Sequence, residues 1–416
     1  MTATRTPATA SATSGGRRGF RGFQGWRIVA VFAVTQTAGY GCLYYAFAVL
    51  LHPVAADLHA SPAAATGALT TALLASAALA VPVGRWLDRH GGRALMTAGS
   101  AAGALVLAAW SQVQSLWQLY AVFVALGAAM ATALYEPATA IIVAWFDPAR
   151  RASALLGMIV VAGFASTVFM PLTGLLEHRY GWRGTLLVLA ALYGGVAVPL
   201  HALVVRRPSQ GSAARRSTPA TRRAEVRAAV RDARFWCLAV AFVAHGAAMS
   251  AMTVHLVGFL VAAGHPATFA ATVAGLLGVL SVTGRLLLTA ARHRFPPHAV
   301  VAAVFAVQAV AAISLPFAGH TRAGAVVAVT GFGLGFGVAS LAVPTLLADR
   351  YGTTAYASIA GTLATPVTLA KAAAPLAAAA LYTAAGGYTP VLATIGGAAL
   401  VAAAGILARA GSPSPG

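Results

Sequence analysis

The chain has 416 residues, of which 59% are hydrophobic and only 9% are charged, and its formal net charge at pH 7 is +20. Soluble globular proteins carry about 25% charged residues, so this composition excludes a soluble protein, and the hydrophobic fraction excludes a disordered one. A membrane protein with several crossings remains.

Hydrophobic stretches long enough to cross a bilayer recur along the whole chain. A helix needs about 20 mainly apolar residues to span roughly 30 Å of hydrocarbon. The sequence therefore predicts an all-α membrane protein with 12 transmembrane helices in two six-helix bundles, residues 26–205 and residues 235–410. The expected helices lie near residues 27–51, 62–83, 94–112, 117–145, 153–176, 184–205, 235–262, 267–290, 298–318, 323–347, 354–383 and 388–409.

Three polar segments flank or join these bundles. Residues 1–25 are rich in Ser, Thr and Ala and predict a disordered cytoplasmic tail, and residues 411–416 form a second tail. Residues 206–234 form a basic cytoplasmic linker that is rich in Pro, Ser and Arg. Such a segment between two halves is usually a tether, so its charge does not predict nucleic-acid binding.

The positions of the cations predict the orientation of the chain. With the N-terminus inside, the inward segments carry 23 of the 28 Lys and Arg residues, whereas the outward loops carry Arg179, Arg183 and Arg322. This positive-inside distribution places both termini in the cytoplasm. The two remaining cations, Arg285 and Lys371, fall inside predicted helices.

The two halves of the chain resemble each other. At an offset of about 205 residues, Ala152-Ser153 matches Ala357-Ser358, and Pro171 matches Pro375. Two similar bundles can rock about a site near the middle of the membrane, which is how alternating-access transporters are built.

The turn after the second expected helix resembles the signature loop of the major facilitator superfamily. A glycine at Gly84 allows close helix contact, and Asp88 can accept hydrogen bonds from the exposed N–H groups at a neighbouring helix N-terminus. The resemblance implies that Arg89 and Arg93 hold a cytoplasmic gate through breakable ion pairs; alternatively, these arginines only enforce topology. The residues of this motif are Gly84, Asp88, Arg89, Gly91 and Arg93.

We single out four ionisable side chains inside predicted spans, where each costs at least about 2.5 kcal/mol and marks a functional hypothesis. They are Glu136, His245, Arg285 and Lys371, the last being the single lysine of the chain. Two cations in a low-dielectric cavity attract a carboxylate. Alternatively, Arg285 lies near the membrane surface because its helix ends early, and Lys371 forms a structural ion pair with Glu136.

The segment Ala370-Lys371-Ala372 with Pro375, together with the isolated Arg285, resembles the oxalate:formate antiporter and monocarboxylate transporter branch of the superfamily. The resemblance implies that Arg285 and Lys371 bind substrate carboxylates. An Asp that monocarboxylate carriers often place one turn before the arginine is Ser281 here. Glu136 is the alternative proton-titratable group.

Polar residues of the first helix add to this site. Gln36, Tyr40 and Tyr44 follow each other at i, i+4 spacing, so they form one stripe that should face the cavity and bind substrate. An aromatic belt at the membrane interface is the alternative for Tyr44. His245 is either a proton relay or a structural imidazole bonded to a helix carbonyl.

We therefore expect a monomeric secondary active transporter in the inner cell membrane that moves a small organic anion, by proton symport or by exchange for a counter-anion. The alternative is an efflux carrier of the same fold for drugs, with Glu136 as the counter-ion of a cationic substrate. The sequence has no motif of a nucleophilic or metal-dependent enzyme. The separated Cys42 and Cys237 predict neither a disulfide nor a metal site, and we expect no cofactor.

Overall fold

The computed structural model describes residues 13–206, 218–291 and 294–408, which are helical almost throughout. Parts of the two expected tails and of the linker, residues 1–12, 207–217 and 409–416, lie outside the described residues. The helices are α1 (Thr13–Tyr40), η1 (Gly41–Tyr45), α2 (Ala46–Asp57), α3 (Pro62–His90), α4 (Gly92–Trp110), α5 (Leu116–Ala133), α6 (Tyr135–Trp145), α7 (Pro148–Ala162), α8 (Ala165–Val204), α10 (Pro219–Arg231), α11 (Ala233–Ala262), α12 (Ala267–Ala291), α13 (Pro297–Ala318), α14 (Arg322–Gly333), α15 (Val338–Tyr351), α16 (Tyr356–Ala385) and α17 (Tyr388–Leu407).

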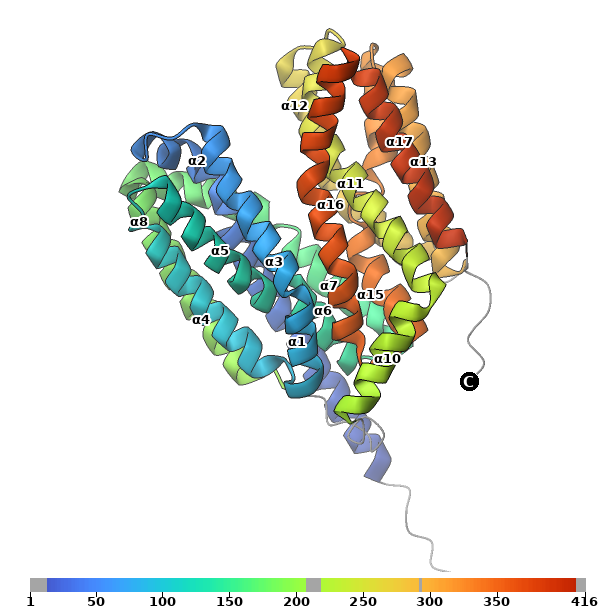
Figure 1. Ribbon diagram of the computed structural model, residues 1–416. Helices are drawn as coiled ribbons and strands as arrows, with labels where there is room; N and C mark the ends of the chain where they lie inside the picture. The colour runs from blue at the N-terminus through green and yellow to red at the C-terminus, as the bar shows by residue number, and fades with distance from the viewer. Residues whose placement is uncertain (1–12, 207–217, 292–293, 409–416) are drawn as a thin grey trace, which may run out of the picture.

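The helices form two bundles that meet at one end of the molecule and diverge toward the other (Figure 1). Helices α1 to α8 make the first bundle, and α11 to α17 make the second. We call the end where α10 lies the linker end, and the opposite end the distal end.

The hydrophobic cores explain this shape. One cluster of buried residues contains side chains of both bundles, such as Leu87 and Met96 with Phe235 and Leu347. The two other clusters each stay within one bundle, between Ala38 and Ala197 in one case and between Ala248 and Ile395 in the other. The bundles therefore share a core at the linker end and have separate cores elsewhere.

Eleven helical segments among the described residues are long and apolar enough to cross a membrane. One of them, Pro148–Val204, has 57 residues, which is more than twice the length that one crossing needs. Its backbone leaves the helical region at Gly181, with φ 65° and ψ 173°. Positive φ is accessible to glycine without strain, so the chain turns here, between the helices expected near 153–176 and 184–205.

Several helix boundaries differ from those expected. Helix α1 already begins at Thr13, so part of the segment predicted to be disordered is helical. The helix expected near 117–145 is interrupted at Leu134, and the one near 323–347 is interrupted between Gly333 and Val338. These two breaks occupy corresponding positions in the two halves of the chain.

The basic linker contains an ordered helix, α10, that the sequence reading did not anticipate. Thr218 caps it by accepting a hydrogen bond from the Thr221 amide at 3.1 Å, and Pro219 takes the first helical position, where its missing N–H costs nothing. Val226 and Val230 pack against the core that the two bundles share. Helix α10 is therefore part of the folded linker end (Figure 1).

Asp232 fixes the junction between α10 and α11. One carboxylate oxygen accepts from the Arg234 amide at 3.0 Å, and the other accepts from Arg350 at 3.2 Å and from Tyr351 at 3.1 Å. Partial burial acts to raise the pKa of Asp232, but these hydrogen bonds outweigh it and hold the pKa below its ordinary value. The start of α11 is thereby tied to the end of α15.

We predict that Asp232→Asn destabilises the protein at pH 7 by about 1 to 2 kcal/mol, because hydrogen bonds to a charged group are lost. Because the pKa of Asp232 is lower in the folded than in the unfolded protein, its carboxylate stabilises the fold at pH values above its unfolded-state pKa of about 3.9. That stabilisation disappears as the pH falls through the folded-state pKa. Denaturation in detergent micelles should thus show a gap between variant and parent at pH 7 that narrows below about pH 4. The control is Asp147→Asn, because the carboxylate of Asp147 makes no hydrogen bond within the described residues. Equal stabilities of Asp232→Asn and the parent at pH 7 would contradict the prediction.

Candidate functional site

The break in the fourth expected helix positions Glu136. Pro137 has no N–H, so the carbonyl of Ala133 four residues earlier lacks its helical partner. The side-chain amide of Gln36 replaces that partner and donates to this carbonyl at 2.9 Å. Gln36 is fully buried. The structure thus uses Gln36 to close a helix break, which differs from the expected place on the cavity wall.

A π-helical turn, η1, brings a second tyrosine into line with Tyr40. The amide of Ala46 donates to the carbonyl of Gly41, which is the i to i−5 pattern of a π-helix. Tyr45, five positions after Tyr40, thereby comes within electrostatic range of it, while Tyr44 at the expected α-helical spacing remains in ring contact with Tyr40. Gly41 leaves room for the ring of Phe169 against this turn.

Four tyrosines from α1, η1 and α6 form a cluster. The ring of Tyr40 lies 4.5 Å from that of Tyr135 and 6.3 Å from that of Tyr44, and the rings of Tyr44 and Tyr45 are 5.2 Å apart. All four side chains are half-buried. Tyr135 was not among the expected site residues, although its place directly before Glu136-Pro137 is a signal for it.

Arg285 reaches from the second bundle toward this cluster. Its Nε atom donates to the carbonyl of Gly337 at 3.1 Å, in the break between α14 and α15, and to Ser340 Oγ of α15 at 3.2 Å. Tyr45 and Tyr135 of the first bundle lie within electrostatic range of the guanidinium. In the part of the chain that the structure describes, only Nε of this side chain makes hydrogen bonds, so the fork of Nη1 and Nη2 is available to a ligand.

The length of α12 bears on the alternative in which Arg285 lies near the membrane surface because its helix ends early. Helix α12 continues to Ala291, and Nη1 of Arg285 lies 3.5 Å from the place that a Cβ atom at Gly163 would take. Gly163 ends α7 in the other bundle. Arg285 therefore points between the bundles.

Lys371 is held on α16 by a second proline-dependent arrangement. Pro375 leaves the carbonyl of Lys371 without a helical donor, and Ser250 Oγ donates to it at 2.6 Å. The Cε atom of Lys371 lies 3.2 Å from the place of a Cβ at Gly246. The side chain is exposed although it comes from the middle of its helix.

Glu136 and Lys371 face each other from opposite bundles. They interact electrostatically, and both side chains are exposed. The three ion pairs found within the described residues do not include them, so they do not form the closed structural pair that was one alternative. Because Tyr135 and Glu136 are neighbours, one helix start approaches both Arg285 and Lys371.

His245 lies behind this site rather than in it. Its side chain is only 3% exposed, and its ring stacks on that of Phe305 with centroids 4.2 Å apart. Lys371 is within electrostatic range of the imidazole. The imidazole is therefore buried beside Phe305, and a proton-relay role for His245 stays a prediction.

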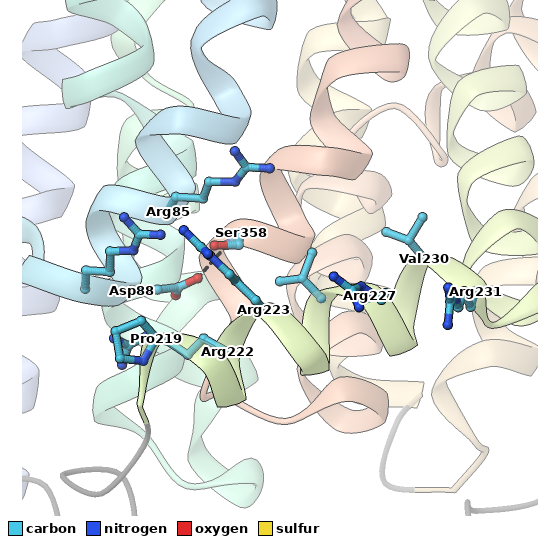
Figure 2. A pocket seen from close by; sticks show the side chains of 11 residues that line it. Arg85, Asp88, Pro219, Arg222, Arg223, Arg227, Val230, Arg231 and Ser358 are labelled. Atoms are coloured by element: carbon cyan, nitrogen blue, oxygen red, sulfur yellow. Dashed lines mark hydrogen bonds between the residues drawn. The ribbon is translucent and has the colours of Figure 1, made fainter.

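The motif at the C-terminal end of α3 contacts the start of α16 at the linker end. The two carboxylate oxygens of Asp88 accept from the amides of Ala357 at 3.1 Å and Ser358 at 2.8 Å. Figure 2 shows the contact with Ser358. Gly84 faces the carbonyl of Ala357, so a side chain there would collide with backbone. Gly91 ends α3 with φ 77°. The motif thus joins the two bundles through backbone groups.

Among the described residues, one ion pair between the bundles joins residues outside this motif. Arg151 Nη1 of α7 lies 3.2 Å from Asp349 Oδ1 of α15, and the arginine side chain is only 6% exposed. Arg89 lines a pocket beside Asp88. Arg93 is exposed and belongs to none of the three ion pairs found among the described residues, and a gating role for Arg89 and Arg93 stays a prediction. No three His, Cys, Asp or Glu side chains of the described residues gather as metal ligands.

The profile of the Major Facilitator Superfamily matches residues 32–375. The chain belongs to this superfamily. No curated protein has a sequence that matches the chain. The superfamily and the fold together make it a multi-pass membrane protein that carries out secondary transport and is a transporter rather than an enzyme.

Several solved structures share the fold. The E. coli fucose:proton symporter aligns with a TM-score of 0.74 and 14% identity over 92% of this chain and 98% of that one. The human organic anion transporter MFSD10 aligns with a TM-score of 0.68 and 16% identity over 91% of this chain and 99% of that one. The proton:xylose symporter aligns with a TM-score of 0.73 and 11% identity over 94% of this chain and 97% of that one. At these identities the likeness concerns the fold alone.

We predict that Asp88→Asn opens the linker end. An amide has a single acceptor oxygen and no charge to complement the N-terminus of α16. The free energy that favours the closed over the open linker end should therefore fall by about 1.5 to 3 kcal/mol, which raises the ratio of open to closed molecules roughly tenfold or more. Spin labels at Arg93→Cys and Phe295→Cys, in a background without Cys42 and Cys237, would report a longer distance across this end.

The control for this experiment is Asp147→Asn, which removes the same charge from the same end but breaks no hydrogen bond of the carboxylate. Its label distance should equal that of the parent. An unchanged distance in Asp88→Asn would show that the contact with α16 does not hold the bundles together.

Proposed function

We propose that the protein transports a small organic anion whose carboxylate binds between the bundles to Arg285 and Lys371. The observation that carries the proposal is the position of Tyr135 and Glu136, two adjacent residues of one bundle that lie within electrostatic range of Arg285 and Lys371 of the other. The sequence-based resemblance to carboxylate carriers supports the same ligand class. A human organic anion transporter among the structures of the same fold is compatible with it.

The topology we propose has twelve crossings, because the 57-residue segment broken at Gly181 supplies two. The positive-inside distribution puts the linker end, with its arginines, in the cytoplasm of a cell-membrane protein. The contacts of Asp88 with α16 and of Arg151 with Asp349 then close the cytoplasmic side. In this arrangement the substrate site is reached from the outside.

The charges of the site favour a monoanion when Glu136 is ionised. Arg285 and Lys371 contribute two positive charges, and Glu136 removes one. An arginine fork binds a carboxylate through two parallel hydrogen bonds, whereas the ammonium group acts as a point charge. Tyr45 and Tyr135 add hydroxyl donors beside the fork. Protonation of Glu136 raises the net charge to suit a dianion, so proton uptake and anion binding are coupled.

A second candidate is efflux of a hydrophobic cation. The tyrosine cluster of Tyr40, Tyr44, Tyr45 and Tyr135 beside the exposed carboxylate of Glu136 offers ring faces and a counter-charge, the two features that recognise an organic cation. For such a substrate the two cations of the site would be unfavourable, which is why we rank it second.

We predict that Lys371→Gln and Arg285→Gln each lower anion transport by about tenfold to a hundredfold, because each removes a charge-assisted contact of about 1.5 to 3 kcal/mol. Uptake of labelled lactate, pyruvate, formate and oxalate into proteoliposomes measures this. Arg294→Gln, an exposed arginine after α12, is the matched control and should transport normally. Full activity of Lys371→Gln in a folded preparation would refute the proposed ligand set.

We further predict that Glu136→Gln separates transport from its proton drive. Glutamine cannot take up a proton, so uptake should no longer respond to an imposed pH gradient, while exchange of labelled for unlabelled anion continues. Glu177→Gln, which alters a carboxylate of α8 outside the site, is the control. If the pH response persists in Glu136→Gln, another group carries the proton; if only export of organic cations is lost, the second candidate is correct.

A further inference from the structure

A pocket of about 530 Å³ opens at the linker end between α3, α10 and α16 (Figure 2). It lies beside the contact of Asp88 with Ser358, far along α3 and α16 from the site proposed for substrate. Pockets of this size hold small molecules or lipid headgroups. Six of its lining residues are arginines: Arg85, Arg89, Arg222, Arg223, Arg227 and Arg231.

The register of α10 concentrates this charge. Arg223, Arg227 and Arg231 follow at i, i+4 spacing and therefore share one face of the helix. Like charges at this spacing destabilise a helix by about 0.2 to 0.5 kcal/mol per pair. Val226 and Val230 nevertheless pack on the shared core and hold α10 in place. The arrangement thus keeps a row of guanidinium groups along one face of α10.

Few acidic groups offset these arginines. Asp88 is the only acid that lines the pocket, and both of its oxygens already accept hydrogen bonds from amides of α16. Glu225 of α10 interacts electrostatically with Arg222 but is not among the lining residues. The pocket therefore has a large excess of positive charge and many guanidinium donors.

We propose that this pocket binds a phosphate-bearing anion, either the headgroup of an anionic phospholipid or a soluble phosphate monoester. Guanidinium forks match the geometry and charge of phosphate, and basic clusters of four to eight residues next to a membrane helix are typical of sites for anionic headgroups. Trp86, which is 46% exposed on the same turn of α3, is the type of side chain found at the membrane surface, within reach of lipid.

Binding favours the closed linker end. The walls of the pocket come from α3 of the first bundle, from α10, and from Ser358 of the second bundle. They come together only while Asp88 contacts α16. A ligand that binds the assembled pocket better than the separated walls shifts the population toward the closed state. The anion is thus a regulator of the transport cycle and is not its substrate.

The test uses the full chain and two kinds of probe. In the first arm, the protein is placed in nanodiscs of phosphatidylcholine with or without phosphatidylglycerol; in the second, it is titrated in phosphatidylcholine discs with inorganic phosphate or glycerol phosphate, against chloride at equal ionic strength. The readouts are binding and the label distance between Arg93→Cys and Phe295→Cys. The variants are Arg223→Gln with Arg227→Gln, and as control Arg150→Gln with Arg294→Gln, which removes two exposed arginines outside the pocket.

The proposal predicts binding in one of the arms, a shorter or more uniform label distance on binding, and a loss of about tenfold or more in affinity for the Arg223/Arg227 variant only. Response in the first arm alone identifies the lipid, and response in the second alone identifies the soluble anion. Equal binding by both variants and the parent, or no binding in either arm, overturns the proposal. Should the double variant not fold, Arg85→Gln on α3 replaces it with the same expected loss.

Discussion

Backbone carbonyls that lose their helical partner inside the membrane must find another donor, and this constraint builds the central site. Hydrocarbon offers no water to satisfy them. Gln36 serves the carbonyl freed by Pro137, Ser250 serves the one freed by Pro375, and Gln308 donates to the carbonyl of Phe332 at the break before α15. Arg285 bonds the carbonyl of Gly337 in that same break. These contacts fix Glu136 beside one helix break, Lys371 one turn before Pro375, and Arg285 of α12 against the break before α15.

The distribution of the cores explains how such a site can be reached from one side at a time. Side chains of both bundles are buried together at the linker end, whereas toward the distal end each bundle buries its own. The bundles can therefore separate at the linker end only by breaking a shared core, the Asp88 contacts and the Arg151–Asp349 pair. These are the interactions against which substrate and coupling ion must work during transport.

Much of this architecture could be predicted from sequence because hydrophobic length, cation position and the motif around Gly84 and Asp88 are local signals. The position of Tyr45 could not be predicted, because a π-helical turn shifts by one residue the positions that share a helix face, and sequence spacing does not reveal such a turn. Gln36 was expected on the cavity wall because its partner, a carbonyl freed in a distant helix, is invisible in the pattern. The ion pair of Arg151 and Asp349 could not be predicted either, because the two residues are 198 positions apart in sequence. A count of charges per loop uses such residues only to assign topology.

The contact between α3 and α16 is made at Gly84 and Gly361, each of which faces a carbonyl of the other helix. Glycine has no rotamers to restrict, so at these two positions the helices part without freeing a side chain and meet again without ordering one. Asp88 and Thr365 add hydrogen bonds to backbone groups of the partner helix, and such bonds can be broken and remade in each cycle. For a carrier that must open and close this contact once for every molecule it moves, reversibility of the contact matters more than its strength.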